Sequence, residues 1–237
     1  MLYVIIFAAI LPAFLLVLYI WLRDKWQREP LSQIFKGVFY GFLSTFIALL
    51  WEESLSYIGL IPEPQSVLGA FWNAFAGAAI PEEASKLLMI WLLLRRNKYF
   101  DERFDGIVYA CCVGMGFAGT ENIGYLLSNI DAWESVAVSR AIFAVPGHFM
   151  FAVVMGYYYS LIAFRDMSLT KKSLVFWMPV LLHGLYDGIL FTANVSPSLQ
   201  GVLILVFYIF VFWMFRFGRK RIQTLSEASN PNNIRFF

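Results

Sequence analysis

Ionisable and polar side chains interrupt the apolar stretches of this sequence at four places. They are Glu82, Glu83 and Lys86, then Glu121 with Asn122, then His148, and finally His183 with Asp187. Carboxylates and neutral imidazoles are the side chains that bind metal ions and that activate water as general bases. The two histidines are the only ones in the chain. If these side chains converge, they make a site for hydrolytic chemistry.

Helical spacing brings several of these side chains together in pairs. At about 100° per residue, Lys86 projects between Glu82 and Glu83 and can pair with either carboxylate. His183 and Asp187 are four residues apart, so they share one face of a helix. Pro81 directly precedes the two glutamates and favours a kink or a new helix start there, because proline has no backbone donor.

The charge of these groups leaves two chemical interpretations open. Four carboxylates, one lysine and two neutral imidazoles would carry about −3 if all were ionised, which a low-dielectric site does not tolerate. Either mutual repulsion keeps some carboxylates protonated, or a divalent cation balances them. Histidine and carboxylate ligands with an open position describe a catalytic zinc site. The same groups without a metal describe a glutamate that activates water directly.

Long apolar helices carry these residues. Of the 237 residues, 60% are hydrophobic and only 14% are charged, which leaves too little polar surface for a soluble domain of this length. The apolar blocks are near the ~20 residues that cross a bilayer as a helix. We predict an all-α polytopic membrane bundle with about seven transmembrane helices, of which the third to the sixth form a four-helix catalytic core. The predicted spans are 2–22, 34–51, 67–94, 106–128, 140–164, 173–192 and 199–217.

The ionisable groups are unevenly distributed over these spans. Each costs about 2.5–3.5 kcal/mol at bilayer depth, so such groups usually face a protein interior and mark function. Four successive spans contribute them, whereas we expect none from the first, second and seventh spans. A shared site between the middle and the outer half of the bilayer is the simplest explanation.

Basic residues mark alternate linkers of the chain. Lys and Arg concentrate after the first, third, fifth and seventh spans, and the intervening linkers hold only Arg140. The positive-inside rule therefore predicts an external amino terminus and a cytoplasmic carboxyl terminus. We predict one membrane domain over 1–221 with its catalytic core at roughly 67–192, and a polar, poorly ordered cytoplasmic tail over 222–237. The lipid bilayer is then a partner, and no nucleic acid is expected.

The motifs resemble those of the PrsW proteases, which are relatives of the type II CAAX prenyl proteases and the bacteriocin-processing Abi proteins. The resemblance consists of EExxK at Glu82–Lys86, FxxxE at Phe117–Glu121, PxH at Pro146–His148 and HxxxD at His183–Asp187. It implies an intramembrane metalloprotease of a bacterial plasma membrane. It also implies a membrane-anchored protein substrate, with the first cut in an anti-sigma factor as the family role.

We assign hypothetical roles on this basis. Glu82 and Glu83 supply a base or a ligand, Lys86 fixes their charge, Asp187 orients His183, and Asn122 donates to the developing oxyanion. The candidate ligands of a divalent metal, zinc in the first instance, are Glu83, Glu121, His148 and His183. The alternative is a proton- or cation-coupled transporter, since carboxylate and histidine chains also mark proton relays. Against it, the sequence has no inverted repeat.

Overall fold

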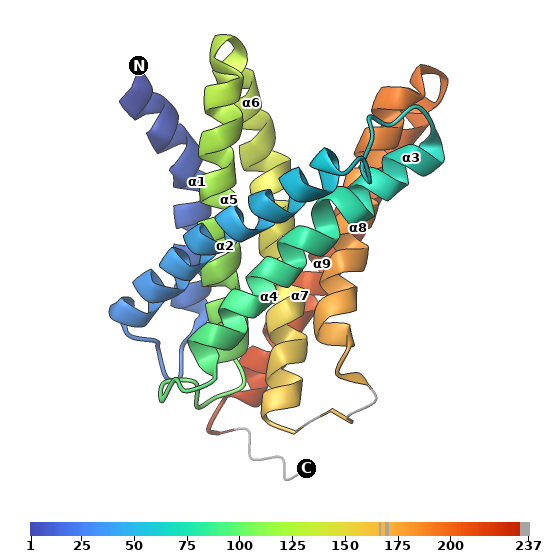
Figure 1. The fold of residues 1–237 in the computed structure, drawn as a ribbon. Coiled ribbons are helices and arrows are strands. Elements are labelled where there is room, and N and C mark those ends of the chain that lie inside the picture. The colour runs from blue at the N-terminus through green and yellow to red at the C-terminus, as the bar shows by residue number, and fades with distance from the viewer. Residues whose placement is uncertain (166, 169–170, 233–237) are drawn as a thin grey trace.

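The computed structural model describes residues 1–165, 167–168 and 171–232, and every regular element in this part of the chain is helical. Seven long helical segments form one bundle (Figure 1). Segments α3–α4 and α6–α7 each contain a π-helical turn, at Asn73–Ala79 and Arg140–Ala144. The α-helices are α1 (Leu2–Arg23), α2 (Leu31–Tyr57), α3 (Val67–Trp72), α4 (Ile80–Leu94), α5 (Asp105–Ser128), α6 (Trp133–Ser139), α7 (Val145–Ala163), α8 (Leu174–Val195) and α9 (Gln200–Ala228).

The predicted helical membrane bundle is confirmed. Each predicted span coincides with one of the seven segments, and five segments are long and apolar enough to cross a membrane by themselves. The other two, α3–α4 and α5, carry the acidic motifs. Large apolar side chains such as Phe7, Phe35 and Phe212 remain exposed on α1, α2 and α9. An exterior of this kind is suited to lipid, and the protein is an integral membrane protein.

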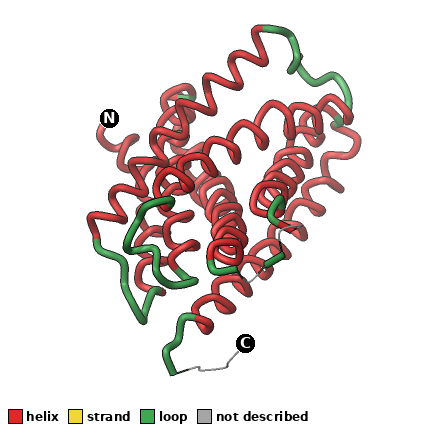
Figure 2. The backbone as a smooth tube through the Cα atoms, turned by 60° about the horizontal axis from the view of Figure 1, so that its bottom comes forward, coloured by secondary structure: helices red, strands yellow, loops and turns green. Residues whose placement is uncertain are grey.

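Helix α5 lies at the centre of the bundle. It packs against α1, α2 and α7, while α8 and α9 pack against α7 (Figure 1). Figure 2 shows that the described chain consists of helices joined by loops. Two glycines permit the contact between α2 and α5. A Cβ atom on Gly41 would lie 2.0 Å from the carbonyl oxygen of Val113, and one on Gly116 would lie 2.1 Å from that of Val38. No side chain fits at either position, so the two backbones touch.

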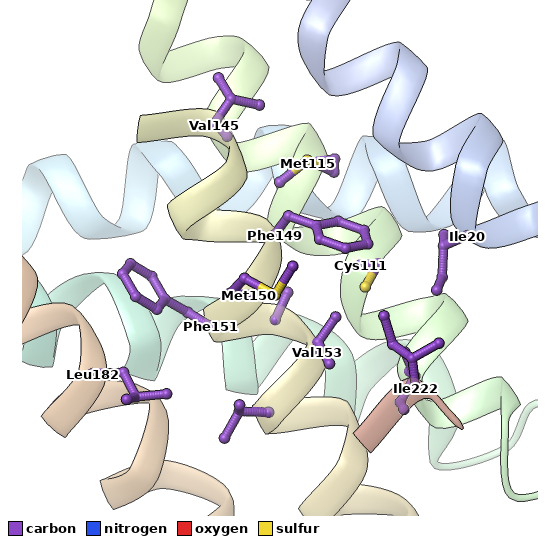
Figure 3. Close-up of a cluster of buried hydrophobic side chains, with 14 of the residues drawn as sticks. Ile20, Cys111, Met115, Val145, Phe149, Met150, Phe151, Val153, Leu182 and Ile222 are labelled. Atoms are coloured by element: carbon purple, nitrogen blue, oxygen red, sulfur yellow. The ribbon is translucent and has the colours of Figure 1, made fainter. Parts of the chain in front are cut away.

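Helix α7 supplies the middle of the apolar core. Phe149 points toward Cys111 of α5, whereas Val153 points toward Ile222 of α9 (Figure 3). Met150 also lies against α9, where a Cβ atom on Gly218 would be 2.5 Å from its sulfur. On the opposite side of α7, Phe151 points toward Leu182 of α8 (Figure 3). The core therefore fixes α7 between the two helices that carry the remaining motifs, α5 and α8.

Both π-helical turns directly precede a proline and a proposed site residue. The first ends at Ala79, just before Pro81 and the two glutamates, and the second ends at Ala144, just before Pro146. Proline lacks the N–H that would continue the α-helical ladder, and a wider turn accommodates that loss. The predicted kink or restart at Pro81 therefore takes the form of a π turn within a continuous helix, without a free amino-terminal end.

The two ends of the bundle differ in their connections. The connections after α1, α4 and α7 lie at the same end as the end of α9, and Met1 lies at the opposite end (Figure 1).

Helix α9 continues beyond Arg221 to Ala228, because Ile222 and Leu225 are buried in the core. The polar tail that we predicted from residue 222 is therefore helical through Ala228, and residues 233–237 lie outside the described part of the chain.

Candidate active site

The EExxK motif forms a buried ion-pair cluster on the first turns of α4. Lys86 Nζ donates to Glu82 Oε2 at 3.0 Å and to Glu83 Oε1 at 2.8 Å. The spacing predicted a pair with either glutamate, and the lysine contacts both. Its ammonium also lies 3.9 Å from the ring centroid of Phe117, the first residue of the FxxxE motif. A single buried cation thus holds both carboxylates in place.

His148 of α7 links this cluster to α5. Its Nδ1 lies 3.2 Å from Lys86 Nζ, and its Nε2 lies 3.0 Å from Glu121 Oε2. An ammonium can only donate, so the hydrogen bonds assign Nδ1 as the acceptor and place the proton on Nε2. His148 is therefore a neutral imidazole oriented by Lys86 and Glu121.

His183 of α8 lies between two carboxylates. Its Nδ1 is 2.9 Å from Glu83 Oε1 and its Nε2 is 3.1 Å from Asp187 Oδ2. The ring stacks on Phe151 with a centroid separation of 4.7 Å, and it stands perpendicular to His148 at 5.3 Å. Carboxylates that accept from a histidine ring fix its orientation, as they do around metal sites.

Glu121 and Asn122 point in different directions. Glu121 forms an ion pair with Arg140, whose guanidinium lies over the Tyr125 ring at 3.8 Å from its centroid. Asn122 is buried against α1, where its amide donates to the carbonyl of Ala9 at 3.1 Å and its oxygen accepts from Arg140 Nε. The structure therefore brings Glu121 to His148, whereas the Asn122 side chain faces α1 and Arg140.

A cavity of about 830 Å³ opens over the cluster and extends toward the end of α5 and the start of α7. Glu82, Glu121, His148, His183 and Asp187 line it, whereas Glu83, Lys86 and Asn122 do not. Glu82 is thus the glutamate of the EExxK motif that can reach a substrate. Its Oε2 lies 4.0 Å from His148 Nδ1 and 4.0 Å from His183 Nε2, between the two imidazoles.

Two charged residues of the cavity were missed by the sequence analysis. Glu52 lines the cavity from α2, which continues to Tyr57, six residues past the predicted end of the second span at 51. The expectation that the second span contributes no ionisable group was wrong for this reason. Arg140 was treated as a linker charge, but it lies in the π turn before α7 and faces the cavity.

The buried donors fit a metal ion. Glu82, Glu83, His148 and His183 each offer one ligand atom, and the four atoms lie within 4.8 Å of one another. Glu83 Oε2 is buried without a hydrogen-bond partner among the described residues, although buried carboxylate oxygens are nearly always satisfied. Nitrogen and carboxylate donors beside a cavity suit a transition-metal ion with an open position. The protein thus holds a Glu/His cluster able to bind a metal.

A helical membrane bundle with such a cluster below a cavity has the features of an intramembrane hydrolase. The sequence profile of the PrsW family intramembrane metalloproteases matches residues 29–214, and the chain belongs to this family. It is therefore an intramembrane protease, and the comparisons favour this function over transport.

Three relatives illustrate how far the similarity extends. The protein is 32% identical to Protease PrsW of Clostridioides difficile over 233 residues, which cover 97% of this chain and 93% of the relative. It is 33% identical to Protease PrsW of Oceanobacillus iheyensis over 211 residues, 86% of this chain and 93% of the relative. Identity to Protease PrsW of Geobacillus kaustophilus is 31% over 208 residues, 86% and 87% of the two chains. No solved structure matches the chain significantly.

Proposed function

We propose that the protein hydrolyses a peptide bond of a membrane-anchored protein in the cavity above Glu82, His148 and His183, with a zinc ion as its cofactor. The supporting observation is the position of Glu82, whose carboxylate lies 4.0 Å from each imidazole at the edge of the cavity. A water molecule between these groups would lie beside a carboxylate base and two imidazole nitrogens at once.

His148, His183 and Glu83 are the proposed zinc ligands. Glu83 fits because one of its oxygens is buried without a partner, whereas Glu121, our fourth candidate ligand, is held by Arg140. When bound, the ion would polarise the scissile carbonyl and make its water ligand more acidic. Glu121 and Asp187 orient the two rings through His148 Nε2 and His183 Nε2.

Glu82 acts as the general base in this proposal. Its carboxylate removes a proton from the attacking water, the water oxygen bonds to the scissile carbon, and the carbon–nitrogen bond breaks as Glu82 returns the proton to the departing amine. Lys86 keeps Glu82 and Glu83 in position through its two hydrogen bonds. The amide of Asn122 already donates to Ala9, so Arg140 is better placed than Asn122 to donate to the developing oxyanion.

We further propose that the amino terminus faces outward and the carboxyl terminus faces the cytoplasm. The basic connections after α1, α4 and α7 gather at the end of the bundle where α9 ends, in agreement with the positive-inside rule (Figure 1). The cavity extends toward the opposite, external end, at Ser128 and Ser139. An anti-sigma factor with a single span, cut near its external side, is a substrate that fits this direction. The catalytic core remains residues 67–192 within a domain of 1–221.

Three substitutions test the site. Glu82→Gln, Glu83→Gln and His183→Ala, made separately, should each lower cleavage of a tagged single-span substrate by about 100-fold or more. The matched control is Glu53→Gln, which removes an exposed carboxylate next to Glu52 and should leave cleavage unchanged. Full cleavage by all three variants would rule out the proposed site. Ion flux in proteoliposomes without peptide cleavage would instead support the transporter alternative.

A further inference from the structure

A second group of buried carboxylates lies at the other end of the bundle. Asp24 follows the last turn of α1, Glu102 lies in the connection between α4 and α5, and Asp105 is the first residue of α5. Asp24 is 1% exposed and Asp105 is fully buried, while Glu102 is partly exposed. Neither the EExxK motif nor any other catalytic motif includes these residues.

The hydrogen bonds of this group leave several oxygens unused. Asp24 Oδ2 accepts from the backbone of Glu29 at 3.0 Å, and Asp105 Oδ2 accepts from the backbone of Asp101 and Glu102 at 3.0 and 2.8 Å. The remaining oxygens, Asp24 Oδ1, Asp105 Oδ1 and Glu102 Oε1, are buried without a hydrogen-bond partner in the described structure. Leaving three buried acceptors unpaired is costly, and each such group calls for a ligand.

The geometry of the three carboxylates matches a hard cation. One oxygen from each of Asp24, Glu102 and Asp105 lies within 4.8 Å of the others. Calcium binds oxygen ligands at about 2.3–2.6 Å, so two ligands on opposite sides of the ion are at most about 5 Å apart. All the donors are oxygens, which favours calcium or magnesium over the transition metals that imidazoles bind.

The charge around the group also favours a cation. Glu29 is buried beside it and accepts a hydrogen bond from Tyr109, while Arg28 is the basic residue that acts on Asp24. Four acidic side chains, Asp24, Glu29, Glu102 and Asp105, therefore lie together at connections whose other charged residues are mostly basic.

We propose that Asp24, Glu102 and Asp105 bind a structural divalent cation, Mg²⁺ or Ca²⁺, separate from the catalytic metal. Asp105 and Glu121 are sixteen residues apart on α5, which separates the two sites by about 24 Å along the helix. The cation would join the end of α1, the connection that follows α4 and the start of α5. Since α4 carries Glu82 and α5 carries Glu121, the ion stabilises the relative position of the two catalytic helices.

The test uses the full chain in detergent micelles after removal of metals. MgCl₂ and CaCl₂ are titrated separately while the melting temperature and the heat of binding are measured, and the double variant Glu83→Gln/His183→Ala serves as a background without the catalytic metal cluster. We expect about one ion per chain and a higher melting temperature in that background. Asp105→Asn and Glu102→Gln should each weaken binding by about tenfold or more, because ligand charge sets affinity in such sites.

The matched control is Asp101→Asn. Asp101 lies in the same connection, but its carboxylate accepts from Gln27 at 2.7 Å and is not one of the three ligands. Its substitution should change affinity by less than about threefold, as expected for an exposed charge. Glu102→Gln affects the most exposed ligand, so it keeps the test decisive if Asp105→Asn does not fold. Unchanged melting temperature with both ions, or equal affinity in Glu102→Gln and the parent chain, would overturn the proposal.

Discussion

Lys86 is the buried cation on which the stability of the active site depends most directly. Lys86→Met keeps the apolar stem and removes the ammonium from side chains that are 4%, 8% and 0% exposed for Lys86, Glu82 and Glu83. Removing one partner of a buried ion pair costs about 3–5 kcal/mol, because the other charge is left buried. Loss of the contact with Phe117 adds up to about 2 kcal/mol. Proton uptake by a carboxylate recovers part of this cost.

We therefore expect Lys86→Met to lower the free energy of unfolding by about 3–5 kcal/mol, or the melting temperature by roughly 10 °C. The assay is equilibrium unfolding in micelles, with the exposed Lys36→Met as the matched control. Adding Glu83→Gln to Lys86→Met should restore about 1–3 kcal/mol, since the stranded charge is then gone. A loss below about 1 kcal/mol in Lys86→Met, or a double variant no more stable than the single one, would refute this reasoning.

Two further substitutions test the packing and the cavity. Gly41→Ala should destabilise the protein by about 1–3 kcal/mol or more, because its Cβ would lie 2.0 Å from a carbonyl oxygen of α5. The control Gly124→Ala, whose Cβ would meet no atom within 4 Å, should be neutral or stabilising. Equal melting temperatures for the two variants would contradict the close contact between α2 and α5. Arg140→Met should lower the initial rate of cleavage of a tagged substrate by about 100-fold if the guanidinium donates to the oxyanion, and Arg140→Lys should recover part of that rate. An unchanged rate in Arg140→Met would exclude Arg140 as the oxyanion donor.

The spans and the ion pair within EExxK could be predicted because they depend on local rules. Apolar blocks of bilayer length give the helices, and the three- and four-residue spacing brings Lys86 to both glutamates. The two histidines meet at 5.3 Å because their helices pack on the common core around Phe151 (Figure 3). Apolar composition indicated that these side chains share an interior but could not give that distance.

The residues that were missed depend on tertiary structure. Glu52 follows the apolar block of α2, and hydropathy alone ends a span where the polar residues begin. In the structure α2 continues, because its polar end faces a cavity and other charges. Arg140 was counted as a linker charge since its partner Glu121 lies nineteen residues away. The direction of Asn122 toward Ala9 depends on the packing of α1 against α5, which no spacing within α5 encodes.

Metal content and peptide cleavage measured on the same purified samples test the metalloprotease assignment most directly. The protein would be analysed by plasma mass spectrometry before and after chelation, and cleavage of a single-span substrate would be followed in parallel. We predict about one zinc per chain in the Glu/His cluster, with activity lost on stripping and restored by zinc. Full activity in protein free of zinc would contradict the metal site and would leave Glu82 as the base of a metal-independent protease.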